Sequence, residues 1–135
     1  MAAVSTSELA RTAVFAGLDE DSLRTVAEWL EVDAVAPGTK LTREGAAGYA
    51  FRVLHEGTAD VLINGALVRK LGPGEFFGEI GILADGRQTA TIVVTSPAVV
   101  WTMFGTRFRE FQEQHPEISA IIERTAAERL GHPIP

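Results

Sequence analysis

Residues 74–91 read GEFFGEIGILADGRQTAT and carry the clearest structural signal in this chain of 135 residues. A glycine followed by one turn of small and apolar residues predicts a short helix. Its first N–H groups have no partner within the helix, and its positive dipole end suits a phosphate. Asp85-Gly86 then predicts a turn, and Arg87-Gln88-Thr89 brings polar side chains back beside the same anion. The stretch therefore predicts an anion-binding loop between a helix start and a strand.

Glu79 lies where that helix begins, and a carboxylate there does not favour a phosphate. We interpret Glu79 as an acceptor of hydrogen bonds from a ribose hydroxyl, because an acidic residue has this role in dinucleotide sites. The alternative is a first-turn acid that only stabilises the helix N-terminus, by roughly a few tenths of a kcal/mol. Both interpretations remain open on the residues alone.

The same stretch resembles the phosphate-binding cassette of the cyclic nucleotide-binding domain family. That family includes the bacterial cAMP receptor protein, kinase regulatory subunits and cyclic nucleotide-gated channels. Channel members carry Gly-Glu-Ile, an apolar run and Gly-Arg-Arg-Thr-Ala-Ser, and here Gly78-Glu79-Ile80 leads without a gap to residues 86–91, GRQTAT. The resemblance covers about the whole chain, through further landmarks at Val14–Leu18, Pro37-Gly38, Leu41–Gly45 and His55-Glu56-Gly57.

The resemblance implies a cyclic nucleotide, cAMP or cGMP, as the ligand, with no other cofactor and no metal. It places the ligand among nine residues: Gly78, Glu79, Ile80, Gly81, Arg87, Gln88, Thr89, Val61 and Leu71. In relatives the position of Thr89 contacts the phosphate or the guanine amino group. The positions of Val61 and Leu71 contact the base, although both residues equally suit a plain hydrophobic core.

Gln88 departs from the family pattern, because the channel arginine at this position binds the cyclic phosphate. Arginine offers a permanent charge and a fork of donors, whereas glutamine offers one neutral amide. Loss of the guanidinium weakens binding by about tenfold to over a hundredfold. Arg87 is adjacent, but neighbouring strand residues point to opposite faces, so it substitutes only if the loop shifts. The alternative function is therefore a domain of the same fold that no longer binds nucleotide and acts as a protein-interaction module.

Composition indicates one compact domain over residues 1–135, with 46% hydrophobic and 22% charged residues. No apolar run is long enough to span a bilayer, and the N-terminus lacks a signal peptide's pattern, so we expect a cytoplasmic location and no membrane contact. The formal net charge of −6 argues against a direct nucleic-acid partner.

Catalysis is not indicated. The chain has no cysteine, and its histidines, His55, His115 and His132, are too scattered for the metal sites that jelly rolls also host. No Ser-His-Asp or paired-acid arrangement is evident. We expect a regulatory module and not an enzyme, acting on an unknown protein effector as a monomer or weak homodimer.

Periodicity predicts N-terminal helices within residues 1–30, strands within 31–104 and C-terminal helices within 105–131. Two helices are expected at Ser7–Ala13 and Asp19–Leu30, and Asn64-Gly65 predicts a two-residue hairpin. A last helix starting at Pro116 carries the apolar stripe Ile118, Ile121, Ile122, Ala126 and Leu130. With the resemblance, these signals predict an α+β fold. It is an eight-stranded antiparallel β jelly roll (double-stranded β-helix) with an internal cassette helix, and two C-terminal helices close over the base.

Overall fold

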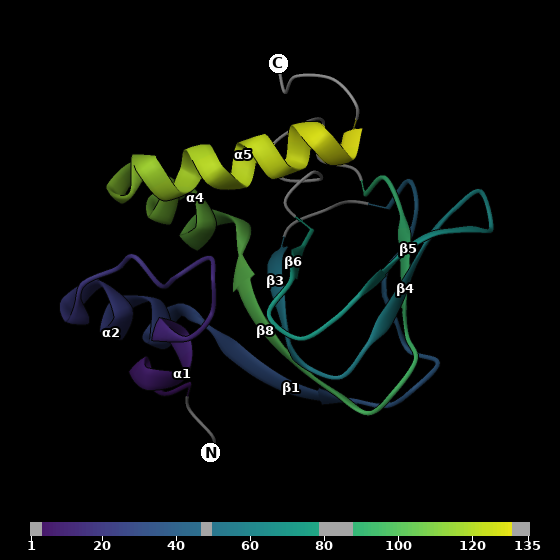
Figure 1. Cartoon of the computed structure of the whole chain (residues 1–135), viewed down its shortest axis with the longest axis horizontal. Helices are drawn as coiled ribbons and strands as arrows, with labels where there is room; N and C mark the ends of the chain where they lie inside the picture. The colour runs from purple at the N-terminus through teal and green to yellow at the C-terminus, as the bar shows by residue number, and fades with distance from the viewer. Residues whose placement is uncertain (1–3, 47–49, 79–87, 131–135) are drawn as a thin grey trace.

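The computed structural model describes residues 4–46, 50–78 and 88–130. The helices described there are α1 (Thr6–Ala10), α2 (Glu20–Trp29), α4 (Gly105–Gln114) and α5 (Pro116–Leu130). In Figure 1, α1 and α2 lie beside the strands, and α5 runs across the top toward β5. The cassette helix expected after Gly78 falls within residues 79–87, which lie outside the described part. None of the described helices is long and apolar enough to cross a membrane.

The strands form two antiparallel four-stranded sheets, in the orders β1-β8-β3-β6 and β2-β7-β4-β5. Their bounds are β1 Glu31–Val35, β2 Lys40–Thr42, β3 Ala50–Glu56, β4 Ala59–Ile63, β5 Ala66–Leu71, β6 Phe76–Phe77, β7 Thr91–Val94 and β8 Ala98–Phe104. Neighbours in each sheet are mostly distant in sequence, as in a jelly roll. The α+β jelly-roll prediction, with eight strands among the described residues, is confirmed.

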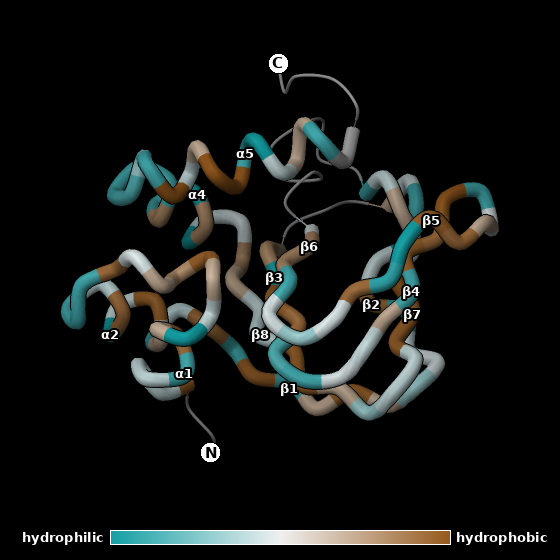
Figure 2. The backbone as a smooth tube through the Cα atoms, viewed as in Figure 1, coloured by the Kyte–Doolittle hydropathy of each residue, from teal (hydrophilic) through white to brown (hydrophobic). Residues whose placement is uncertain are grey.

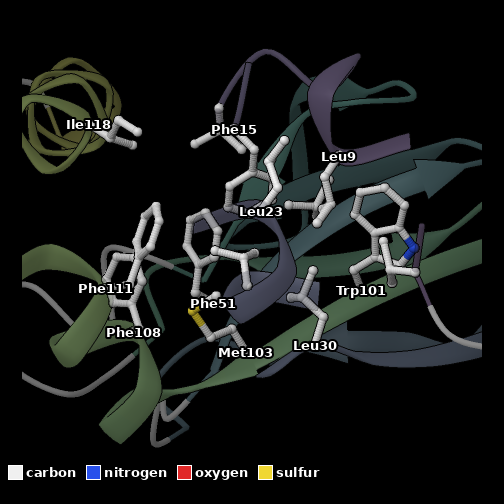
Figure 3. Close-up of a cluster of buried hydrophobic side chains, with 14 of the residues drawn as sticks. Leu9, Phe15, Leu23, Leu30, Phe51, Trp101, Met103, Phe108, Phe111 and Ile118 are labelled. Carbon is white, nitrogen blue, oxygen red and sulfur yellow. The ribbon is translucent and has the colours of Figure 1, made fainter. Parts of the chain in front are cut away.

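Alternation along the strands divides the interior into two cores. On β3, Phe51 and Val53 face the helices, whereas Leu54 faces the second sheet. Phe51 stacks on Phe108 of α4 with 4.7 Å between ring centroids, so the first core joins sheet and helices (Figure 3). The second core lies between the sheets and contains Leu54, Ala59, Val61, Leu71, Phe77, Ile92, Val94, Ala98 and Val100.

Arg52 also points between the two sheets, because it alternates with Phe51 and Val53. Its guanidinium donates a hydrogen bond to the backbone oxygen of Leu41 on β2. Burial lowers the pKa of Arg52, and the negative charge of Asp33 opposes that shift. The side chain therefore ties β3 of one sheet to β2 of the other near the edge of the interior.

The N-terminal helices are shorter than the periodicity indicated. The helix expected at Ser7–Ala13 is α1, which begins one residue earlier and ends at Ala10. Beyond it the backbone continues in tight turns, with hydrogen bonds from Phe15 N to Thr12 O and from Leu18 N to Phe15 O. These turns keep Val14 and Phe15 buried without a regular helix, so apolar spacing alone overestimated the helix length.

The hairpin prediction is confirmed. Asn64 and Gly65 have φ angles of +52° and +79°. Positive φ at both central residues is what the common two-residue hairpin turn of type I′ requires. The strands pair Ile63 with Ala66 and Leu62 with Leu67, and a bulge then places Val61 opposite Arg69. The strand ends beside the turn are apolar, as the brown segments near the β5 label in Figure 2 show, and the side chains of Ile63, Leu67 and Val68 are exposed.

The last helix begins at Pro116 as expected, but its apolar stripe is narrower than expected. Ile118, Ile122 and Ala126 are spaced by four residues and are buried. Ile121 is 52% exposed, so its inclusion in the stripe was wrong. One residue corresponds to about 100° around a helix, which turns Ile121 away from the face that Ile122 occupies. The side chain of Leu130 lies outside the described part.

Gly78 marks the point where the chain leaves β6 of the first sheet. Its φ is +88°, and a Cβ at this position would overlap the carbonyl oxygen of Ala50 on β3. Any other residue must therefore both strain its backbone and push the two segments apart. Glycine is required here by geometry as well as by conformational freedom.

We expect Gly78→Ala to lower the free energy of unfolding by roughly 2 kcal/mol or more, because the strain and the overlap add. Gly17→Ala is the matched control, since its φ is not positive and a Cβ there meets nothing within 4 Å. Urea unfolding of both variants and the wild type measures the difference. Equal effects of the two substitutions would contradict the close-approach argument.

Candidate functional site

A cavity of about 540 Å³ lies between the second sheet and α5. Thr42, Val61 and Ile92 line it from β2, β4 and β7, and the hairpin adds Ile63, Val68 and Arg69. The remaining described lining residues are Phe77, Gly78, Gln88, Thr89 and Ala90 at one side and Thr125 and Glu128 on α5. An apolar sheet surface, a polar loop and a helix therefore enclose one space.

Four of the nine residues predicted from the sequence line this cavity: Val61, Gly78, Gln88 and Thr89. Leu71 is buried in the core between the sheets and is not among the lining residues. The other four, Glu79, Ile80, Gly81 and Arg87, lie outside the described residues. Residues from β4, from the end of β6 and from the segment before β7 thus meet although they are distant in sequence.

The backbone around Gln88 is fixed by pairing with residues 45 and 46. Gly45 N donates to Gln88 O at 2.9 Å, and Gln88 N donates to Ala46 O at 2.8 Å. The hydroxyl of Thr42 donates to Ala90 O at 2.9 Å. These bonds extend the β2–β7 pairing beyond the strands. They hold the Gln88–Ala90 segment at the cavity wall without using the side chains of Gln88 or Thr89.

Glu44 holds the hairpin against this same loop. Its Oε1 accepts a hydrogen bond from Asn64 N at 2.8 Å, and its own N–H donates to Thr91 Oγ1 at 3.1 Å. One residue thus links the hairpin turn to the start of β7. The two sides of the cavity are therefore positioned relative to each other.

Sequence reasoning missed the two charged residues of the described lining, Arg69 and Glu128. Arg69 Nη1 lies 3.5 Å from Glu75 Oε1, and Glu75 Oε2 accepts a hydrogen bond from Gly72 N at 2.6 Å. Glu128 follows Thr125 by three residues, so both lie on one side of α5. The apolar stripe of α5 predicts only that this helix packs against the core. Nothing in the sequence pattern indicates that the polar side beside the stripe lines a cavity.

The chemistry of this cavity suits binding. It offers apolar surface from Val61 and Ile92, hydroxyl and amide groups from Thr89 and Gln88, and one charge of each sign. Within residues 4–46, 50–78 and 88–130, no group of three or more His, Cys, Asp or Glu side chains is placed to hold a metal ion.

A second cavity of about 460 Å³ lies between α1 and the 72–75 turn. Here His55 stacks on Trp101, and its Nε2 lies 2.9 Å from Glu8 Oε2. The Ser5 hydroxyl donates to Glu8 Oε1 at 3.0 Å and lowers the pKa of that carboxyl, with further contributions from the Ser5 backbone N–H and the charge of His55. Glu8 therefore joins the start of α1 to β3.

Because the pKa of Glu8 is lower in the folded state, its contribution to stability is present at neutral pH and lost as pH falls through the folded value. We expect Glu8→Gln to destabilise by less than about 1 kcal/mol at neutral pH, since the carboxyl is partly exposed. Glutamine keeps an acceptor for the helix cap. The difference from wild type should shrink progressively as pH falls below 4.5, measured by urea unfolding over a series of pH values. A difference that is constant with pH would show that the charge of Glu8 is not involved.

In a comparison with known families, residues 32–115 match the model of the cyclic nucleotide-binding domain. The match runs from β1 through the strands to the end of α4 and includes every described residue of the sheet side of the 540 Å³ cavity.

Individual relatives are similar at moderate identity. The chain is 31% identical over 97 residues to a cAMP-dependent protein kinase regulatory subunit of Yarrowia lipolytica, which covers 72% of this chain and 26% of that protein. It is 29% identical over 117 residues to human potassium/sodium hyperpolarization-activated cyclic nucleotide-gated channel 1, covering 87% of this chain and 13% of the channel. This chain thus spans about a quarter or less of these relatives.

A solved structure, the regulatory domain of Toxoplasma gondii PKA crystallised with cAMP, superposes with a TM-score of 0.69 at 28% identity. The superposition covers 78% of this chain and 42% of that one.

Proposed function

Because this chain belongs to the cyclic nucleotide-binding domain family, a family of regulatory domains, we propose that it binds a cyclic nucleotide, cAMP or cGMP, in the cavity between the second sheet and α5. Residues 1–135 act in this proposal as one domain. It carries out no reaction and passes the binding event to a protein effector. We further propose that it works in the cytoplasm and as a monomer or weak homodimer, without contacting nucleic acid or membrane.

The observation that supports this proposal most is the convergence of Val61, Gly78, Gln88 and Thr89 on one cavity. These residues were selected from the sequence by motif alone, and they come from three separate segments. The volume of about 540 Å³ lies within the range of small-molecule sites, roughly 300–1,000 Å³. A nucleotide needs such a mixture of apolar surface for the base and donors for the phosphate.

In the proposed complex the phosphate lies against the segment that begins at Gly78, where Ile80, Gly81 and Arg87 supply backbone or side-chain donors. Glu79 accepts hydrogen bonds from the ribose. The Gln88 amide and the Thr89 hydroxyl donate to the phosphate oxygens from a backbone already fixed by its pairing with residues 45 and 46. The base lies over Val61, and Leu71 supports that surface from the core.

Transmission uses α5. Thr125 and Glu128 line the cavity, while Ile122 on the same helix is buried in the core that contains Phe108 of α4. A ligand that contacts α5 favours one placement of this helix over others, and the population shifts toward it. The effector then meets a different surface of α4 and α5.

Isothermal titration calorimetry with cAMP and cGMP tests the proposal. A ligand at 100 times its dissociation constant adds about 2.7 kcal/mol to stability, so the thermal midpoint should also rise. The 2′-deoxy cyclic nucleotides should bind more weakly by about 1–3 kcal/mol, and Glu79→Gln should remove that preference. The fold of the variant is checked by its unfolding curve.

Equal binding of ribose and deoxyribose forms by the wild type would show that Glu79 is only a helix-start acid. Absence of heat and of any thermal shift at millimolar cAMP and cGMP would reject nucleotide binding. The proposed function of this chain would then be that of a protein-interaction module with the same fold.

Gln88→Arg should raise cyclic nucleotide affinity about tenfold or more, because a charge-assisted bidentate contact contributes roughly 1.5–3 kcal/mol. The backbone at this position is already hydrogen bonded, so little rearrangement opposes the gain. Arg87→Ala in the wild type is the counter-test by the same calorimetry. If Arg87→Ala abolishes binding and Gln88→Arg gains nothing, Arg87 binds the phosphate and the register assigned to this segment is wrong by one residue.

A further inference from the structure

The 460 Å³ cavity between α1 and the 72–75 turn is separate from the proposed nucleotide site, because no described residue lines both cavities. Its charged and polar side chains belong to Glu8, Arg11, Thr12, His55 and Glu75. The apolar side chains among its described lining residues are those of Ala13 and Pro73, and both are small. This lining favours a small polar ligand over an apolar one.

Glu8 of α1 and Arg11 at the end of that helix line the cavity without pairing with each other. Residues three apart on a helix are neighbours, and opposite charges at this spacing commonly form an ion pair. Here the Glu8 carboxylate accepts a hydrogen bond from the Ser5 hydroxyl at 3.0 Å and lies 2.9 Å from His55 Nε2. The exposed guanidinium of Arg11 makes no hydrogen bond or ion pair with any residue in the described part of the chain. A positive and a negative group are therefore both available to a ligand.

Glu75 adds a second carboxylate from the 72–75 turn. Its Oε2 accepts a hydrogen bond from Gly72 N at 2.6 Å, and its Oε1 lies 3.5 Å from Arg69 Nη1. The turn is tied to β3, because Gly74 N donates to Leu54 O at 2.7 Å and Leu54 N donates to Glu75 O at 2.9 Å. An ionised carboxylate has about four lone-pair sites, so Glu75 keeps acceptor sites for a ligand in addition to these contacts.

His55 and Thr12 hold the shape of the lining. The His55 ring stacks on the buried ring of Trp101, with 4.2 Å between centroids and 18° between planes. The Thr12 hydroxyl donates to the backbone oxygen of Glu8 at 3.0 Å, which fixes the chain just beyond α1. A ligand that enters the cavity therefore meets groups that are already positioned, and less ordering opposes its binding.

We propose that this cavity is a second ligand site of the domain and binds a small zwitterion of the α-amino acid class. The carboxylate of the ligand accepts hydrogen bonds from the planar donor fork of Arg11. Its ammonium group has three donors, which the carboxylates of Glu8 and Glu75 accept. A simple anion would meet these two carboxylates, and a simple cation would leave Arg11 without a partner. A zwitterion satisfies both signs of charge.

Amide NMR titrations of the labelled chain with glycine and with L-serine, at constant ionic strength, test this proposal. Both ligands should shift the amides of residues 11–13, His55 and Gly74 at millimolar concentrations. Acetate and methylammonium each carry one half of the zwitterion and should bind at least tenfold more weakly, because each lacks one charge-assisted contact. L-phenylalanine should also bind more weakly than L-serine, since its ring is large and apolar.

Two substitutions locate the site. Arg11→Gln and Glu75→Gln should each weaken glycine binding about fivefold or more, because each removes one charged contact of a partly exposed group. Arg24→Gln on α2 and Glu113→Gln on α4 are the matched controls, since both residues are exposed and neither is among the described lining residues. The controls should leave the affinity unchanged. Urea unfolding curves check that each variant is folded.

The absence of shifts with glycine and L-serine at millimolar concentrations would reject the proposal. Binding of acetate as tight as that of glycine would show an anion site, and equal binding of L-phenylalanine and L-serine would contradict a small polar site, so either result rejects it. An affinity that Arg11→Gln or Glu75→Gln leaves unchanged would place the ligand elsewhere. The outcome does not depend on nucleotide binding, because the two cavities share no described residue.

Discussion

The close approach of Gly78 to the Ala50 carbonyl is the constraint on which the site depends. At Gly78 the chain leaves β6 of the first sheet, and it pairs again with the second sheet at Gln88. The missing Cβ lets the chain pass directly against β3 at Gly78, and both Gly78 and Gln88 line the same cavity. The pairing of Gln88 with residues 45 and 46 fixes the backbone at Gln88. These backbone contacts do not depend on which side chain stands at position 88.

Under our proposal, that arrangement lets the site bind a nucleotide with Gln88 in place of an arginine. In the family pattern an arginine supplies charge at this position, whereas here the anchored backbone and the Thr89 hydroxyl remain as donors. Among the described lining residues, the charged ones are Arg69 and Glu128. Glu75 lies 3.5 Å from Arg69 and orients its guanidinium. Under our proposal, the site therefore attracts a phosphate less strongly than it would with an arginine at position 88.

Sequence predicted the fold well because its strongest signals are local. Asn64-Gly65 fixes a turn by backbone conformation, Pro116 suits a helix start, and alternating apolar residues define the strands. Arg69 was missed for a specific reason: an unbroken two-residue hairpin pairs Val61 with Val68, and the bulge shifts the partner to Arg69. A bulge depends on packing between strands and has no signature in this stretch. Ile121 was wrongly placed in the apolar stripe, and Glu128 was missed, because the exposure of each side chain depends on where α5 lies against the sheets.

Amide NMR spectroscopy of the labelled chain during separate titrations with cAMP and with cGMP tests the central claim most directly, because it reports on the cavity residue by residue. The account predicts shifts concentrated at Gly78, at Gln88–Ala90, at Val61 and at Thr125 and Glu128 of α5. The 460 Å³ cavity beside His55 should shift little. Shifts confined to α1 and His55, or none up to millimolar concentrations of either nucleotide, would contradict a nucleotide site between the second sheet and α5.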